Sequence, residues 1–180
     1  MTKRAGIDFS LTSPAVCVGI DGGPHVLHSF RASKKQKSTH PDIILYDYPE
    51  WSHQQERLEK LALWVFDIVK DCDSIQIEGY SMGSKGRVFD IAEGTELVKY
   101  FLWKHGKDLL LIPPTTAKQF ATGKGNATKN LMVLAYNKEE YALDVFSALG
   151  KIFDPANKKV ASPMGDLIDS YWMWKYREKI

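Results

Sequence analysis

The sequence has little of what marks a secreted, membrane-bound or thiolate-metal protein. It contains only two cysteines, Cys17 and Cys72, which show no metal-binding spacing, so we expect reduced thiols. No segment approaches the ~20 continuous apolar residues of a membrane span. Residues 1–9 run directly into a strand-like segment rather than a signal peptide. We therefore expect a cytoplasmic protein without a membrane partner.

A strong charge bias is also lacking. The 180 residues carry 24 Lys and Arg against 22 Asp and Glu, a formal net charge of +2. If four acids bind cations at one site, the other 18 acidic residues face 24 basic ones, an excess of six. Such an excess suits a polyanionic partner. The length indicates one domain spanning residues 1–180.

Five short segments rich in β-branched, aromatic or other apolar residues predict five strands, at residues 4–9, 15–20, 26–31, 75–78 and 109–112. The turn Asp21-Gly22-Gly23-Pro24 indicates a hairpin between the second and third strands. The basic segment 32–50 is predicted to be a loop with little regular structure. This order favours an α/β fold with a mixed sheet, three antiparallel strands followed by parallel additions, flanked by helices. Element order alone leaves rival α/β folds open.

Apolar residues at helical spacing predict helices at about 52–69, 88–104, 116–120, 127–136, 138–148 and 163–176. Ser52 and Gln55 form a capping-box pattern, so Ser52 is expected to cap the first helix. Ser162 before Pro163 is the expected cap of the last helix. That last helix is unusually apolar, so we expect it to pack on the domain.

Two carboxylates stand where apolar strands end. Asp8 follows Ala5-Gly6-Ile7, and Glu78 follows Ile75-Gln76-Ile77. An acid among apolar neighbours must be paired, lie at an edge or hold a cation. If the two strands are parallel neighbours, ~4.8 Å apart, both carboxylates can share a metal. The alternative is that Asp8 simply ends its strand and caps the following turn.

Two further carboxylates, Asp166 and Asp169, are three residues apart on the predicted last helix, so they share one face at ~5–6 Å. The alternative is a pair of acids favoured only by the helix dipole. Four acids that converge without a cation would repel one another, which argues against a purely structural role for all of them. Oxygen ligands suit Mg²⁺ or Mn²⁺ rather than zinc. Two such ions, ~3.5–4 Å apart, could activate a water molecule on a phosphodiester.

Four sequence blocks, in order across nearly the whole chain, resemble the RuvC family of Holliday junction resolvases, in particular its phage-type members. The blocks are GIDFSLTSPAVCV, IQIEGYSMGSKGRVFDIAEGTELVKYFL, PPTTAKQFATGKGNATKNLMV and GDLIDSYWMW. The resemblance implies a ribonuclease-H-like fold and a homodimer that cuts branched DNA such as a four-way junction. It implies an endonuclease with two Mg²⁺ ions per site, which Mn²⁺ can replace, leaving a 5′-phosphate and a 3′-hydroxyl. A phage-encoded member would act in the cytoplasm of the bacterial host.

The resemblance also assigns roles to single residues. Its implied metal ligands and catalytic residues are Asp8, Glu78, Asp166 and Asp169. Its implied DNA contacts are Lys118, Lys124, Lys129, Tyr80, Lys85 and Arg87; the first three are otherwise solvated lysines of a surface loop. Tyr80 or Phe89 is the candidate for the aromatic residue that family members insert into the junction, although Phe89 could equally pack in the core. The family's usual Asp-Pro-Gly is replaced here by Asp8-Phe9-Ser10.

Three other functions fit part of the pattern. An RNase H that cuts RNA–DNA hybrids would use the same acids. The first block also resembles the phosphate loop of actin-like and heat-shock-chaperone ATPases, but those need two such lobes and 180 residues supply one. A catalytically inactive DNA-binding module would not need four intact acids. We therefore expect a structure-selective DNA endonuclease, with cleavage of hybrids as the main alternative.

Overall fold

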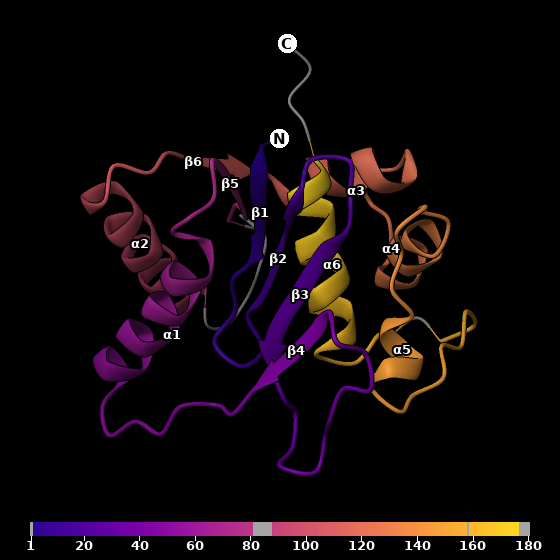
Figure 1. Cartoon of the computed structure of the whole chain (residues 1–180), viewed down its shortest axis with the longest axis horizontal. Helices are drawn as coiled ribbons and strands as arrows, with labels where there is room; N and C mark the ends of the chain where they lie inside the picture. Colours follow the sequence, from indigo (N-terminus) through magenta and orange to yellow (C-terminus); the bar gives the residue numbers. More distant parts are fainter. Residues whose placement is uncertain (1, 81–87, 158, 177–180) are drawn as a thin grey trace.

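A mixed β-sheet forms the centre of the computed structural model, which describes residues 2–80, 88–157 and 159–176 (Figure 1). The strands are β1 (Lys3–Asp8), β2 (Ala15–Ile20), β3 (His25–Phe30), β4 (Ile43–Tyr46), β5 (Ser74–Glu78) and β6 (Leu109–Ile112). They lie in the order β4-β3-β2-β1-β5-β6. β2 is antiparallel to β1 and β3, and the other neighbouring pairs are parallel. The predicted antiparallel core with parallel additions is confirmed.

The sheet has six strands, so the prediction of five is wrong. The sixth, β4, lies in the segment 32–50 that the sequence assigns to a loop. Its four residues are too few to show an alternating pattern beside the lysines that precede them. The exposed edge of β3 supplies their pairing partner, with Leu27 opposite Ile43 and Phe30 opposite Tyr46.

Helices cover both faces of the sheet (Figure 1). They are α1 (Gln54–Val69), α2 (Val88–Lys104), α3 (Pro114–Thr122), α4 (Lys129–Tyr136), α5 (Val145–Ala148) and α6 (Met164–Lys175). α1 and α2 form one apolar core with the sheet, and α6 forms the other together with α4 and α5. The sheet is therefore buried between two apolar layers.

Three predicted helix features are wrong. The predicted helix 138–148 is helical only in α5, because the Tyr136 hydroxyl accepts a 2.8 Å hydrogen bond from the Leu143 backbone N–H and holds the residues between them in turns. The cap of α1 is His53, while the Ser52 backbone N–H donates to the Glu56 carboxylate at 2.8 Å. The N-cap of α6 is Pro163 rather than Ser162, and the described residues contain no side-chain hydrogen bond that caps this helix.

α6 lies directly against β1 at Gly6. A Cβ atom at Gly6 would fall 2.0 Å from the backbone nitrogen of Trp174, so a side chain there would push the helix off the strand. α6 is buried along almost its whole length, as its apolar sequence predicts. The helix that carries Asp166 and Asp169 is thereby held against the strand that ends in Asp8.

Candidate metal centre

Asp8 and Glu78 lie at the carboxyl ends of two neighbouring parallel strands. Ile7 of β1 is opposite Ile77 of β5, so the next residue on each strand places the two acids side by side. This arrangement is the one that the sequence predicts. Both acids lie at the same edge of the sheet, where the loops that follow β1 and β5 begin.

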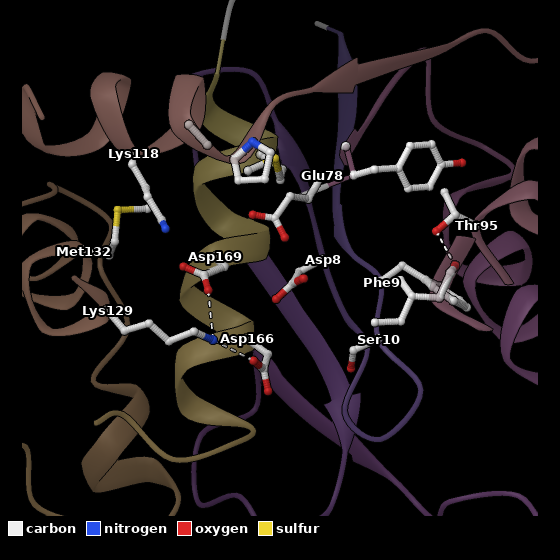
Figure 2. Close-up of a pocket in the computed structure, with 16 residues that line it drawn as sticks. Asp8, Phe9, Ser10, Glu78, Thr95, Lys118, Lys129, Met132, Asp166 and Asp169 are labelled. Carbon is white, nitrogen blue, oxygen red and sulfur yellow. Dashed lines mark hydrogen bonds and ion pairs between the residues drawn. The ribbon is translucent and has the colours of Figure 1, made fainter. Parts of the chain in front are cut away.

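Asp166 and Asp169 approach this edge from α6. Oxygen atoms of Asp8, Asp166 and Asp169 all lie within 4.8 Å of one another. Asp8 and Asp166 are only 8% and 7% exposed. Glu78 lines the same pocket, of about 390 Å³, and Figure 2 shows its carboxylate directed toward the three aspartates. The four predicted acids are therefore brought to one pocket from three separate elements.

Two donors orient the acids of α6. The Lys129 Nζ atom lies 3.0 Å from Asp166 Oδ1 and 3.1 Å from Asp169 Oδ2 (Figure 2). The Ser13 hydroxyl donates a buried hydrogen bond of 2.6 Å to Asp166 Oδ2. Both oxygens of Asp166 are thus engaged, so its carboxylate plane has one preferred orientation.

The accumulated negative charge changes how the acids titrate. Burial, then the charges of Glu78 and Asp169, raise the pKa of Asp8 well above its ordinary value. Burial, and then the charge of Asp169, raise the pKa of Glu78 to about 7. The pKa of Asp169 is also raised, mainly by burial, although Lys129 opposes the shift. Two lysines, Lys129 and Lys118, line the pocket beside the four acids and do not neutralise them, so the pocket favours additional positive charge.

The donor set fits a divalent cation. Carboxylate oxygens are hard ligands of the kind that Mg²⁺ and Mn²⁺ prefer. The three aspartates alone offer ligand atoms within reach of one ion, and Glu78 adds a fourth carboxylate at the pocket wall. No His or Cys lines the pocket among the described residues, which argues against zinc.

The predicted DNA contacts lie in different surroundings. Lys118 of α3 and Tyr80 both line the pocket, and the Tyr80 hydroxyl donates to Glu96 at 2.6 Å. Lys124 is exposed in the turn after α3 and does not line the pocket. Lys85 and Arg87 lie outside the described residues. Phe89 is 82% exposed, so the alternative that it packs in the core is wrong.

Phe9, where the resembled family has proline, has a packing role. Its ring is buried against α2, where a Cβ at Gly94 would fall 2.4 Å from a ring carbon. The loop after Phe9 is held by Arg57, a buried residue whose guanidinium donates to the Leu11 carbonyl and to the Tyr48 hydroxyl. The ring of Phe9 and the hydrogen bonds of Arg57 therefore anchor this loop.

Ser13 and Arg57 are the residues of this site that sequence reasoning misses. Ser10, Thr12 and Ser13 supply three hydroxyls close together in the sequence. Only the folded chain reveals which one meets an acid 153 residues away. Arg57 sits among the core-facing residues of α1, and a charged residue on an apolar helix face is the one signal that could have drawn attention to it.

Solved structures share this fold. Thermus thermophilus RuvC matches with a TM-score of 0.57 and 17% identity over 95% of this chain and 92% of that one. T. thermophilus RuvC in complex with a Holliday junction substrate matches with a TM-score of 0.60 and 15% identity, over 96% and 92%. The yeast mitochondrial Holliday junction resolvase Ydc2 matches with a TM-score of 0.57 and 14% identity, over 97% and 76%. No protein-family model matches the sequence, and no curated protein matches it significantly. The ribonuclease-H-like fold of RuvC-type proteins is therefore confirmed for this chain.

Proposed function

We propose that this chain is a divalent-metal-dependent endonuclease that resolves Holliday junctions or other branched DNA. The observation that carries the proposal is the convergence of Asp8, Asp166 and Asp169 within 4.8 Å, in a pocket that Glu78 also lines. The shared fold supports the choice of substrate, because one solved structure with this fold is a RuvC bound to a Holliday junction substrate.

The four carboxylates would hold two Mg²⁺ ions, or Mn²⁺ in their place, as oxygen ligands of the hard type. Ions bound in this way activate water and stabilise the charge of a phosphodiester under attack. The chain's own cations would support the same phosphate. Lys118 carries positive charge toward Glu78 and Asp169, and Lys129 bonds to both acids of α6.

DNA contacts outside the pocket would come from exposed basic residues near it. Lys124 is exposed and free of side-chain partners within the described segments, so it suits a phosphate contact. Tyr80 would contact the DNA beside the pocket that it lines. We propose the same role for Lys85 and Arg87.

The proposed enzyme is a homodimer of a single domain comprising residues 1–180. A four-way junction is cut symmetrically at two positions, and a two-fold dimer offers two equivalent sites. The proposed location is the cytoplasm. No helix among the described residues is long and apolar enough to cross a membrane.

Substrate choice separates this proposal from its main alternative. An RNase H acting on RNA–DNA hybrids would need the same acids, so the pocket alone does not distinguish the two. An actin-like or chaperone-like nucleotide lobe is disfavoured, because it gives no role to Asp166 and Asp169, which α6 brings to the pocket beside Asp8.

One experiment tests the function directly. Purified protein is incubated with Mg²⁺ and, in parallel, a four-way junction, a flap, a linear duplex and an RNA–DNA hybrid. We expect cleavage of the junction at symmetric positions and little cleavage of the duplex. Cutting of the hybrid alone would overturn the resolvase proposal, and absence of cutting in all four would overturn the nuclease proposal. An Asp8→Asn variant shows whether any cutting comes from this pocket, with Asp71→Asn as a control on an exposed acid.

A further inference from the structure

The segment 31–40, here called the basic loop, leaves the sheet at the edge that carries the carboxylates. Asp8 is opposite Ala15, and Ala15 is opposite Ser29, so the three residues form one row across the sheet. β1 and β3 run in the same direction because both are antiparallel to β2. Ser29 is two strand spacings from Asp8, and Arg31, where the loop begins, lies two residues beyond Ser29. The backbone of Arg31 is therefore roughly 12 Å from that of Asp8.

The basic loop is held at both ends. At its start, the Arg31 backbone N–H donates to the Tyr46 carbonyl at 3.0 Å, and the Arg31 side chain pairs with Asp47 at 3.2 Å. Within the loop, the Gln36 side chain accepts a 2.7 Å hydrogen bond from the Ala32 backbone N–H. Near its end, the Thr39 backbone N–H donates at 2.9 Å to the carbonyl of Ala148, the last residue of α5. The loop therefore presents a defined surface where it projects beyond the sheet on its way from β3 to β4 (Figure 1).

Three lysines of the loop have no partner among the described residues. Lys34, Lys35 and Lys37 are exposed, and they form no hydrogen bond or ion pair with the described part of the chain. The nearby Asp47 is already paired with Arg31. Lysines elsewhere, such as Lys60 and Lys99, pair with glutamates on their own helices. Unpaired cations crowded on one loop repel each other, and a polyanion relieves that repulsion.

We propose that the basic loop binds the phosphate backbone of a duplex arm whose scissile phosphate lies at the carboxylate pocket. This inference rests on the proposed function and names the surface that holds the arm. Starting roughly 12 Å from Asp8, the loop lies within one turn of B-DNA, about 34 Å, from the pocket. Lysine contacts to phosphate carry no sequence information, so the contact is independent of sequence.

The test compares two variants with the same loss of charge. The loop variant combines Lys34→Gln, Lys35→Gln and Lys37→Gln. The control combines Lys3→Gln, Lys70→Gln and Lys104→Gln, three exposed lysines that lie at the opposite edge of the sheet, where β1 begins and α1 and α2 end. Binding to a fluorescent four-way junction is followed by anisotropy in EDTA at several salt concentrations.

We expect the loop variant to bind the junction on the order of 10-fold or more weakly. The slope of the log of the binding constant against the log of the salt concentration should be less steep by up to about 2.7, since each lost phosphate contact removes about 0.9 from that slope. The control should bind like the wild type. Single-turnover cleavage by saturating loop variant should stay within about two-fold of the wild-type rate, because the loop lies outside the pocket. Equal affinity and equal salt slope for wild type and loop variant would overturn the inference.

The outcomes separate this inference from the proposed function. Loss of junction binding in the loop variant, combined with no cleavage by the wild type, would support the loop and contradict the nuclease. Normal cleavage by the wild type combined with unchanged junction binding by the loop variant would support the nuclease and contradict the loop. Vesicles containing anionic phosphatidylserine test a membrane as the partner. Loop-dependent binding to those vesicles without loop-dependent binding to DNA would also overturn the inference.

Discussion

The carboxylate pocket and the basic loop lie at the same end of the sheet, where β1 and β3 end. They differ in the sign of their charge and in its exposure to solvent. In the pocket, Asp8 and Asp166 are almost fully buried, and Lys129 and Ser13 bond to the acids of α6. In the basic loop, the lysines are exposed and have no partner within the described residues. Buried, converging oxygens suit a small hard cation, whereas exposed cations on a loop suit an extended polyanion.

This difference separates two steps of the proposed reaction. Changes in the pocket should alter metal binding and the cleavage rate while leaving DNA affinity in place. Changes in the loop should alter DNA affinity and its salt dependence while leaving the rate at saturation in place.

The largest effect is expected from Asp8→Asn. The variant should cleave a four-way junction on the order of 1,000-fold more slowly, because metal-based stabilisation of a phosphodiester amounts to several kcal/mol. Its affinity for the junction in EDTA should match that of the wild type. Single-turnover cleavage and anisotropy provide the two measurements. Asp71→Asn, a change at an exposed acid, is the control, and a fully active Asp8→Asn enzyme would contradict the assignment of the pocket.

A smaller effect is expected from Ser13→Ala. This change removes the 2.6 Å hydrogen bond that orients Asp166, and loss of such a supporting bond lowers metal affinity about 10- to 100-fold. Calorimetric titration with Mn²⁺ measures the change without DNA or turnover. Thr12→Ala removes an exposed hydroxyl from the same loop and should bind Mn²⁺ normally. Equal Mn²⁺ affinity in Ser13→Ala and wild type would show that Asp166 does not depend on this bond.

The pH dependence of stability should also reveal the pocket. Burial raises the pKa of Glu78 from 4.5 to about 7, so the folded protein binds this proton more tightly than the unfolded chain does. The tighter proton binding adds to the free energy of unfolding. This contribution is fully present below about pH 4.5 and is lost as the pH rises through 7, and we expect the loss to be on the order of 1–3 kcal/mol. Thermal unfolding in EDTA between pH 5 and 8 measures it. Glu78→Gln should flatten the dependence, and a dependence as steep as the wild type's would contradict this explanation.

The smallest effect is expected from Lys129→Met. Without metal, the variant leaves Asp166 and Asp169 with no counter-charge from this side chain. Because the lysine side chain is 43% exposed, we expect a loss of only about 1 kcal/mol, or ~2–4 °C in Tm. Added Mg²⁺ should reduce the difference from the wild type. Lys124→Met changes an exposed lysine outside the pocket and should leave Tm unchanged; an equal Tm for Lys129→Met in EDTA would argue against the counter-charge.

Much of the pocket's geometry follows from local sequence patterns. Asp8 and Glu78 interrupt apolar runs at strand ends, and the parallel pairing of β1 with β5 brings them together as predicted. The three-residue spacing of Asp166 and Asp169 places both on one face of a helix, and the apolar residues around them indicate that this helix is buried. The strand ends and the helix face depend on neighbours within a few residues, whereas the pairing of β1 with β5 joins segments about 70 residues apart.

The features that sequence reasoning missed depend on distant contacts. β4 is too short to show a periodic pattern, and its partner is the free edge of β3. Residues 138–144 contain enough apolar side chains to suggest a helix, yet they form turns and irregular backbone, with the Leu143 N–H bonded to the Tyr136 hydroxyl. The link between Ser13 and Asp166 joins the first loop to the last helix. Such contacts form only when the whole chain folds.

We propose that these carboxylates form a metal-dependent active site for branched DNA. The decisive measurement is the single-turnover cleavage rate of a synthetic four-way junction across a Mg²⁺ titration, for the wild type and for Asp169→Asn. We predict no cleavage by the wild type in EDTA, symmetric products whose rate rises with Mg²⁺ to saturation, and almost no cleavage by Asp169→Asn at any Mg²⁺ concentration. A rate that is independent of Mg²⁺, or equal in the two proteins, would contradict the claim.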